Sequence, residues 1–477
     1  MTSGKQNPII DQRKKLRRKD LARRTVKAGD VLLTLIPFVL VWFLYYVRIV
    51  PGNNPRMSFI LILLYTVLYI FFGKTYDAFL MSYKRISELF TGQVLAILFA
   101  DTTLFLVLIA MTDGFPNVLP ALCAIVAQWM LALVWCICAH IWYFKHHSAK
   151  KTAVVYDVRP YEGLVEQYGL SKKFDVQKIL TAEEAIMDLT ILKDMETVFF
   201  SGVHSHDRNV MLKYCIDNGI TALIIPRIGD VIMGGAKKMH LFHLPILQVE
   251  RSRPRFSFIA VKRVFDIVFS VTLLLAMSPI MLLVAIAVKT DGGPVFYRQV
   301  RLTRDGKEFN ILKFRSMCVD AEKMTGAVLS AGENDPRITK VGRIIRACRI
   351  DELPQLFNIV KGDMSVVGPR PERPEISAEY EKEMPEFRLR LQVKAGLTGY
   401  AQVYGKYNTE PYDKLNMDLM YIAEASIVED LKIILATFVI LFSRESTDGI
   451  AEGESNAMKI HPGAHAAVPD DGEDSDE

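Results

Sequence analysis

The run VFDIVFSVTLLLAMSPIMLLVAIAV, residues Val264–Val288, decides how the C-terminal half of this chain meets a membrane. At about 25 residues it is long enough to cross the hydrocarbon core of a bilayer, which takes about 20. Cations flank both of its ends, with Arg263 on one side and Lys289 on the other. Because cationic flanks tend to stay on the cytoplasmic face, a full crossing would put one flank on the unfavourable side.

The centre of the run holds Ser278-Pro279. Proline supplies no backbone N–H and clashes with the preceding turn, so it kinks a helix sharply. We therefore predict a re-entrant helix over 264–288 that enters and leaves on the cytoplasmic face, with the freed backbone groups bonded by Ser278 or by other protein groups. An ordinary fifth spanning helix is the alternative.

Towards the N-terminus, a basic segment precedes a group of apolar segments. Residues 1–28 are polar and rich in Lys and Arg. Since an apolar segment follows at once, they suit a cytoplasmic anchor near anionic lipid better than a nucleic-acid-binding arm. The connections between the apolar segments alternate between cation-rich and cation-poor, which predicts a four-helix transmembrane module over 29–145 with both ends in the cytoplasm. The four segments lie at about 30–49, 57–73, 90–112 and 118–143.

Asp101 lies within the third apolar segment. An ionisable residue inside a membrane is a candidate functional group. We favour a polar contact inside the helix bundle, because we find no second charge within the spans, and a transporter would be better supported by several.

Residues 150–250 alternate short strands with helical patterns, which predicts a small α/β, Rossmann-like domain. The predicted strands are 152–156, 198–201 and 221–226, and the predicted helices are 181–192 and 206–218. No glycine follows the first strand before Gly163, so the phosphate-binding glycine fingerprint of dinucleotide sites is missing. A regulatory or assembly role is favoured, and His204 and His206 are interpreted as solvated loop residues rather than metal ligands.

The composition agrees with a chain that is partly in the membrane and partly in a reducing compartment. Of the 477 residues 51% are hydrophobic, the formal net charge is +5, and the six cysteines form no Cys-x-x-Cys pair. Neither a zinc site nor a disulfide framework is therefore indicated. Residues 451–477 are polar and end in an acidic run, which predicts a disordered tail.

The chemistry-bearing residues lie between 290 and 445. Two predicted strands, 295–301 and 309–317, carry cations, with Lys313 and Arg315 expected on one face. An amphipathic helix over 340–348 then leads to Asp351-Glu352. Two carboxylates beside cations suit an anionic substrate and a bridging metal. Alone, the pair could simply be a charged helix N-terminus.

Several ordered motifs over roughly residues 256–445 resemble those of the bacterial sugar transferases. These are the polyprenyl-phosphate phosphoglycosyl transferases, which prime exopolysaccharide and O-antigen synthesis, and the preceding helices and α/β domain look like the long form of the family. The motifs are Lys262–Asp266, Lys313–Met317, Asp351–Leu356 and Gly368–Pro371.

The resemblance implies an undecaprenyl-phosphate hexose-1-phosphate transferase. Asp351 would attack the β-phosphorus of a UDP-sugar, releasing UMP, and undecaprenyl phosphate would then take the phosphosugar from the carboxylate. Glu352, with Asp351, would hold Mg²⁺. Three cations at family positions would neutralise the reacting phosphates, and the Gly-Pro-Arg-Pro turn would bind phosphate bidentately through its arginine. The three cations are Lys313, Arg315 and Arg346. The residues expected to bind substrate are Arg370, Pro369 and Gln402.

Other residues stay in structural roles or depart from the family pattern. Asp266 is expected to pair with Lys262 and Arg263 at the membrane surface. In the signature over 394–403, Ala395 stands where proline is common, and Lys406 later stands where arginine is common, which leaves the nucleotide and sugar contacts open. The apolar segment 430–442 is short for a span and suits an interfacial helix.

Two other classes of protein are alternatives: a non-catalytic membrane scaffold for polysaccharide assembly and a transporter of lipid-linked sugar. The expected fold is thus a four-helix membrane module, a small Rossmann-like α/β domain and a mixed α/β catalytic domain with a re-entrant helix. We expect a multi-pass protein of the inner, cytoplasmic membrane that binds lipid and no nucleic acid, with the catalytic domain on the cytoplasmic face. The sequence does not specify the sugar, the polysaccharide pathway or the oligomeric state, although helices without a part in the chemistry invite self-association.

Overall fold

The computed structural model describes residues 8–441, except 53, 82–83, 85, 113, 147–148, 159–172, 252–255, 319–336 and 406–408. By contacts, the chain divides into two compact units. The first holds the N-terminal helices and part of the small α/β region, and the second holds the rest of that region and all residues from Ile224 onward. The sequence-based predictions for the tail over 451–477, Gly163 and Lys406 fall outside the described residues.

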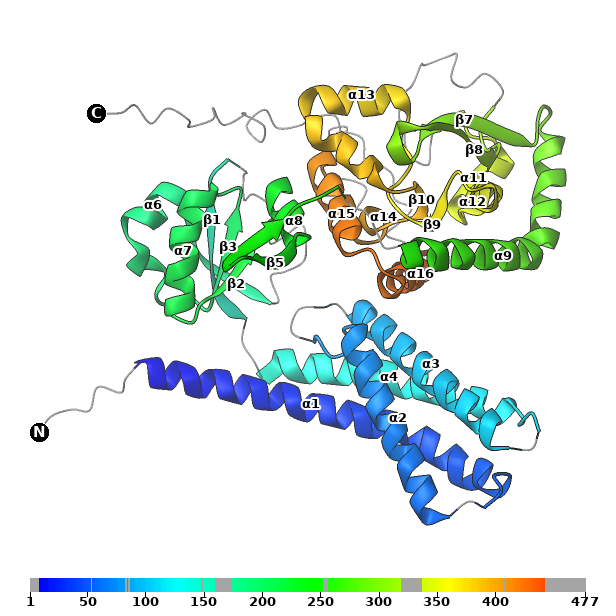
Figure 1. Cartoon of the computed structure of the whole chain (residues 1–477), viewed down its shortest axis with the longest axis horizontal. Coiled ribbons are helices and arrows are strands. Elements are labelled where there is room, and N and C mark those ends of the chain that lie inside the picture. The colour runs from blue at the N-terminus through cyan, green and yellow to red at the C-terminus, as the bar shows by residue number, and fades with distance from the viewer. Residues whose placement is uncertain are drawn as a thin grey trace, which may run out of the picture. The chain divides into compact units, whose positions relative to one another are not determined.

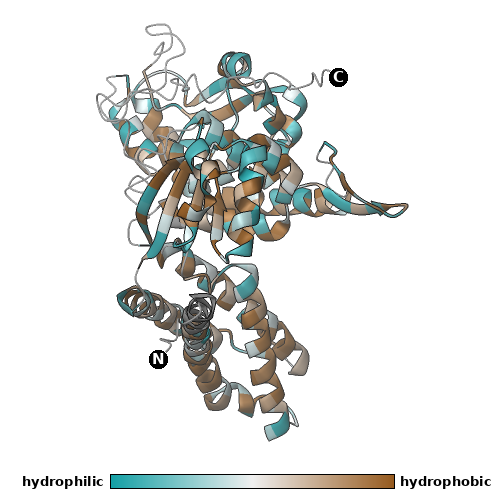
Figure 2. Cartoon of the chain, turned by 90° about the vertical axis from the view of Figure 1, so that its left-hand side faces the viewer, coloured by the Kyte–Doolittle hydropathy of each residue, from teal (hydrophilic) through white to brown (hydrophobic). Residues whose placement is uncertain are grey.

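The N-terminal helices of the first unit cover all four apolar segments. They are long, apolar over most of their length, and packed on one another (Figures 1 and 2). The first begins within the basic segment, and a short 3₁₀ turn at Tyr46–Arg48 follows it. Their bounds are α1 Pro8–Leu44, α2 Pro55–Thr75, α3 Ile86–Met111 and α4 Leu119–His146. With α9 (Phe256–Thr290), five described helices are long and apolar enough to cross a membrane, as expected of a membrane-embedded protein.

Asp101 makes the expected contact inside the bundle, where its Oδ2 accepts a hydrogen bond from the Tyr65 hydroxyl at 3.3 Å. The reason given for that expectation was wrong, because a second carboxylate lies in the same bundle. Asp30 of α1 is 2% exposed and accepts a hydrogen bond from Tyr69 at 2.8 Å.

The region after α4 forms a four-stranded sheet with the order β2-β1-β3-β4. The three predicted strands and both predicted helical stretches are present, although the first stretch breaks where the Asp188 side chain caps a 3₁₀ turn. β2 and the antiparallel β5–β6 pair were missed. The strands are β1 Lys150–Tyr156, β2 Phe174–Thr181, β3 Thr197–Ser201, β4 Thr221–Ile224, β5 Lys237–Leu241 and β6 Leu244–Gln248; the helices are α6 Ala182–Met187, α7 Ser205–Asp217 and α8 Ile228–Gly234.

α9 is one long helix interrupted by a sharp bend, and Figure 1 shows the two segments on either side of it. Pro279 lies inside the helix and cannot donate to the carbonyl of Leu275, one turn earlier. The Ser278 hydroxyl replaces that donor, with Oγ 2.8 Å from the Leu275 oxygen. The prediction that Ser278 would bond a freed backbone group is confirmed.

The rest of the second unit is a mixed α/β structure around one buried cluster. β7 and β8 pair antiparallel from Phe296↔Phe314 to Leu302↔Glu308, and short parallel strands β9 and β10 lie in its core. Ile228 and Val231 of α8 are buried in the same cluster as Leu415 and Leu419, so α8 is part of this core. The elements are β7 Phe296–Leu302, β8 Glu308–Phe314, α11 Lys340–Ala347, α12 Gln355–Lys361, β9 Ser365–Val367, α13 Pro374–Glu383, β10 Gly396–Thr398, α14 Tyr400–Tyr404, α15 Pro411–Glu424 and α16 Ile427–Leu441.

Candidate active site

The two adjacent carboxylates stand in a tight turn between α11 and α12. Thr339 caps α11 by accepting a hydrogen bond from Gly342 N at 2.9 Å. Arg349 then adopts a left-handed conformation with φ 52°, which is uncommon for a residue with a side chain. This reverses the chain and starts the 3₁₀ turn Ile350–Glu352, which carries both Asp351 and Glu352.

Glu352 is held by cations from two other segments. Lys313 Nζ, at the end of β8, lies 2.8 Å from Glu352 Oε1, and Arg370 Nη2 lies 3.5 Å from the same oxygen. Burial alone would raise the pKa of Glu352, but Lys313 and Arg370 outweigh it and hold this pKa well below its usual range. Glu352 is therefore ionised at all pH values at which the protein would work.

The pKa of Asp351 is shifted in the opposite direction. Burial, with the neighbouring charge of Glu352, raises its pKa to about 6, although Lys313, Arg346 and Arg349 act against that rise. No described residue donates a hydrogen bond to its carboxylate. The site thus holds one carboxylate that is paired with two cations and one that accepts no hydrogen bond from the described residues.

The Gly-Pro-Arg-Pro turn lies against the signature over 394–403. β9 pairs in parallel with β10, with Ser365 opposite Gly396. The pairing continues into the turn, since Gly368 N donates to Thr398 O at 2.9 Å and Gly396 N donates to Pro369 O at 2.9 Å. Two motifs far apart in sequence therefore fix the backbone from which Arg370 reaches Glu352.

Gly368 leaves no room for a side chain. A Cβ there would lie 2.3 Å from Lys394 O. We expect Gly368→Ala to lower the free energy of unfolding by about 1–3 kcal/mol and to reduce activity, because the turn that carries Arg370 must shift. The melting temperature and the initial rate of the purified protein measure both effects. Gly229→Ala, where a Cβ meets nothing within 4 Å, is the control, and equal behaviour of the two variants would contradict this account.

Arg390 contacts the backbone of the same turn, and the sequence did not predict this contact. It is 6% exposed, donates to Arg370 O at 2.9 Å and pairs with Asp418 Oδ2 at 2.8 Å. Burial raises the pKa of Asp418 to about 6, while Arg390 lowers it. Arg390 lies in the run Arg388-Leu-Arg-Leu, where no spacing distinguishes it from a surface cation.

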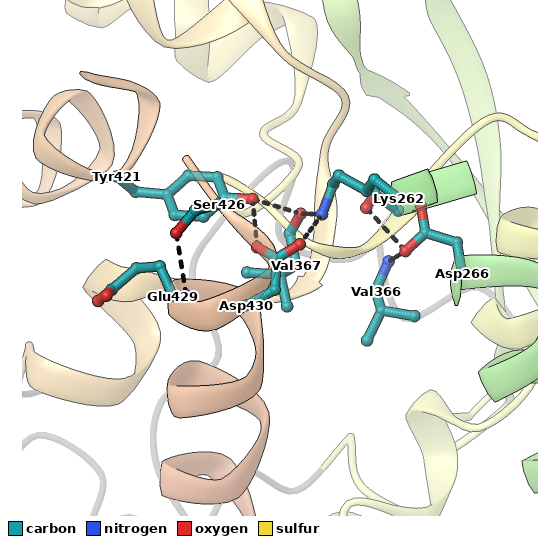
Figure 3. A network of polar contacts seen from close by, with 9 residues as sticks. Lys262, Asp266, Val366, Val367, Tyr421, Ser426, Glu429 and Asp430 are labelled. Carbon is teal, nitrogen blue, oxygen red and sulfur yellow. Dashed lines mark hydrogen bonds and ion pairs between the residues drawn. The ribbon is translucent and has the colours of Figure 1, made fainter. Parts of the chain in front are cut away.

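Hydrogen bonds join the N-terminal part of α9 to β9 (Figure 3). Asp266 Oδ1 accepts hydrogen bonds from Ser365 Oγ at 3.1 Å and from Val366 N at 3.0 Å. The expectation that Asp266 pairs with Lys262 and Arg263 is therefore wrong, because buried backbone and hydroxyl donors occupy its carboxylate. β9 leads directly into the Gly368 turn, so this contact links the apolar helix to the site.

The two cations next to Asp266 bind elsewhere. Lys262 Nζ pairs with Asp430 Oδ2 at 2.6 Å, and Tyr421 donates to the other oxygen of Asp430 at 2.8 Å (Figure 3). Arg263 donates to the carbonyls of Ile359 and Val360 at 2.7 and 2.8 Å, where α12 ends. Both side chains thus join α9 to the rest of the second unit.

The remaining predicted residues are divided between the site and its surroundings. Arg315 donates to Val288 O at 3.0 Å and is 6% exposed, so its described contact is with the end of α9 and not with the carboxylates. The predicted strand 309–317 is too long at its C-terminal end, because β8 ends at Phe314 and Arg315 follows it. Arg346 lies close enough to lower the pKa of Asp351. Gln402 donates to Leu397 O at 3.4 Å, inside the signature loop.

The described residues include no group of three or more His, Cys, Asp or Glu side chains that could hold a metal ion. Asp351 and Glu352 are two carboxylates side by side. Mg²⁺ is typically held by one or two carboxylates together with substrate phosphates and water. The pair fits that ion if the substrate supplies the remaining oxygens.

The candidate site is thus a half-buried pair of carboxylates with Lys313 and Arg370 beside it. Residues 257–444 match the family of bacterial sugar transferases, and this region of the chain belongs to that family.

Three relatives show how far the similarity extends. An uncharacterized sugar transferase of Haemophilus influenzae is 33% identical over 50% of this chain and 54% of its own length. A UDP-glucose:undecaprenyl-phosphate glucose-1-phosphate transferase of Klebsiella pneumoniae is 45% identical over 37% of this chain and 39% of its own length. A UDP-galactose-lipid carrier transferase of Erwinia amylovora is 30% identical over 61% of this chain and 62% of its own length. The chain thus spans about half the length of the curated relatives it matches.

Proposed function

We propose that this protein transfers a hexose-1-phosphate from a UDP-sugar to undecaprenyl phosphate and so primes exopolysaccharide, capsule or O-antigen synthesis. The observation that carries the proposal is the contrast between the two carboxylates. Asp351 has no hydrogen-bond donor among the described residues, whereas Glu352 is held by Lys313 and Arg370. The printed names of the Klebsiella and Erwinia relatives support the substrate classes.

In the first step, a carboxylate oxygen of Asp351 attacks the β-phosphorus of the UDP-sugar. A bond forms between that oxygen and the phosphorus, and the bond from the phosphorus to the bridging oxygen breaks. UMP leaves with the bonding electrons, and the sugar phosphate stays on Asp351 as an acyl phosphate. Arg370 and Lys313, already at the site, offset the negative charge of the diphosphate.

In the second step, an oxygen of undecaprenyl phosphate attacks the same phosphorus. The bond to Asp351 breaks, the carboxylate is regenerated, and the lipid carries a diphosphosugar. Asp351 and Glu352 would hold Mg²⁺, which when bound neutralises charge on the substrate phosphates.

The acceptor is a membrane lipid, so we propose that α9 enters and leaves the membrane on the cytoplasmic face. Three features of α9 support this topology. Cations lie at both of its ends, it bends at Ser278-Pro279, and few of its side chains are buried by the protein. Leu275, Leu282 and Leu283 are all more than 60% exposed, which suits contact with lipid. The site beside α9 would then face the compartment in which nucleotide sugars are made.

The formation of the phosphosugar intermediate should depend on pH. Because burial raises the pKa of Asp351 to about 6, the attacking carboxylate is protonated below that pH and ionised above it. The rate constant for labelling should fall about tenfold per pH unit below about pH 6 and level off above about pH 7. Glu352 stays ionised over this range and adds no second transition. Single-turnover labelling with a UDP-sugar measures the profile, and a constant rate down to about pH 5 would argue against Asp351 as the attacking group.

The proposed activity is tested by incubating the purified protein with undecaprenyl phosphate and each of a panel of UDP-sugars. We expect UMP release, dependent on the lipid acceptor at steady state, with one or a few of the sugars. The named relatives use glucose or galactose, so these two sugars come first. No UMP release with any sugar, from protein shown to be folded, would contradict the proposal.

A further inference from the structure

The four-helix module contains a chain of buried polar groups. Asp30 and Asp101 are only 2% and 7% exposed, although both lie in helices long enough to cross a membrane. Hydrogen bonds connect each of them to a tyrosine and a glutamine. Tyr69 OH and Gln93 Nε2 donate to Asp30 at 2.8 and 2.9 Å; Tyr65 OH donates to Asp101 at 3.3 Å, and Gln128 Nε2 donates to Tyr65 OH at 2.8 Å.

A cavity lies beside Asp30 and is lined by residues of α1, α3, α4 and the connection between α2 and α3. Its wall includes Lys27, Asp30, Gln93 and Trp135. Gln93 is 3% exposed, and its Oε1 has no hydrogen-bond partner among the described residues. The indole N–H of Trp135 is likewise buried and has no partner there.

These wall groups divide into hydrogen-bond acceptors and donors. Asp30 and Gln93 Oε1 accept, whereas Lys27 Nζ and Trp135 Nε1 donate. Asp30 forms no ion pair with a cation of the described chain, and buried charges normally have a partner. The cavity therefore suits a molecule that has a cationic donor and an anionic acceptor close together.

The position of the cavity favours a lipid over a soluble ligand. The first candidate span begins at Arg24, six residues before Asp30, which is about 9 Å along a helix. Lys74 and Lys145 lie in the last turns of α2 and α4. Asp30 is thus at about the depth of lipid headgroups, in a part of the bundle that lipid surrounds.

We propose that this cavity binds the headgroup of a zwitterionic, amine-bearing phospholipid such as phosphatidylethanolamine. The ammonium group donates to Asp30 and Gln93 Oε1, and the phosphate accepts from Lys27 and Trp135. This site belongs to the helical module and is independent of the proposed transfer reaction.

Binding is tested with the full-length protein in mixed micelles that contain phosphatidylethanolamine and phosphatidylglycerol with the same acyl chains. Native mass spectrometry measures which lipid stays bound. We expect wild-type protein to retain phosphatidylethanolamine in preference, and Asp30→Asn to reduce that preference about tenfold, as for the loss of one charged hydrogen bond. Asn keeps the shape of the side chain, so the helices should still assemble.

Two further variants separate a lipid site from a structural contact. Gln93→Met removes the unpartnered oxygen and should also weaken retention, whereas Asp101→Asn, at the other buried carboxylate, should leave it unchanged. Melting temperatures show whether each variant is folded. Equal retention by wild type and Asp30→Asn, or an equal loss in Asp101→Asn, would overturn the proposal. Displacement of the lipid by soluble phosphoethanolamine at equal concentration would overturn the assignment to a lipid.

Discussion

Asp351→Asn should abolish transfer of the phosphosugar, with a fall in turnover of at least about 10⁴-fold, because the amide cannot form the acyl phosphate. UMP release and lipid product are the measurements. The same experiment separates three classes of protein. A scaffold would keep supporting polymer synthesis with this variant, and a transporter would keep moving lipid-linked sugar. Substantial turnover by Asp351→Asn would contradict the assigned nucleophile.

The same substitution should make the protein more stable at neutral pH. The pKa of Asp351 is raised to about 6 in the folded protein, so folding disfavours its ionised form. This penalty is absent below the unfolded pKa and is fully present above about pH 6. Asn removes it, which corresponds to a gain of about 1–3 kcal/mol at about pH 7.5 and none at about pH 4. A melting temperature that falls at neutral pH would contradict the environment derived for Asp351.

The second large effect is expected at the buried pair Lys262–Asp430. The side chains are 16% and 1% exposed, and they join α9 to α16. Lys262→Met leaves the Asp430 charge buried, with Tyr421 as the remaining side-chain donor among the described residues. This should lower the free energy of unfolding by about 3–5 kcal/mol. Thermal unfolding in detergent measures the loss.

Two control variants test whether this loss of stability comes from the buried, uncompensated charge. Lys262→Met combined with Asp430→Asn removes the uncompensated charge, so it should recover part of the stability. Lys361→Met breaks the pair between Lys361 and Asp363, in which the lysine is 73% exposed, and should cost less than about 1 kcal/mol. A similar loss in Lys262→Met and Lys361→Met would show that the α9 anchor does not depend on burial of this pair.

The sequence predicted those features that depend on local pattern. The apolar runs predicted the long helices, and the strands predicted at 295–301 and 309–317 correspond to β7 and β8. Ser278-Pro279 predicted the bend in α9. Adjacent carboxylates near cations marked Asp351-Glu352 and Lys313 as candidates, and the family motifs suggested their roles. The resemblance itself is confirmed by the match over 257–444.

What could not be predicted depends on contacts between distant segments. The partner of Lys262 is 168 residues away, and Asp266 is next to its expected cations in sequence but bonds β9 in the structure. Asp30 follows Lys27 at the edge of the first apolar segment, where it looks like part of an interfacial charge pair. Its burial and its hydrogen bonds to Tyr69 of α2 and Gln93 of α3 become apparent only in the structure.

The most direct test of the central claim uses a UDP-sugar labelled on the β-phosphate and no lipid acceptor. We expect the wild-type protein to release UMP once, to carry the label on Asp351, and to pass it to undecaprenyl phosphate when the lipid is added. The label should be absent from Asp351→Asn. Turnover with lipid present, but no label on the protein under the same conditions without it, would contradict the covalent mechanism.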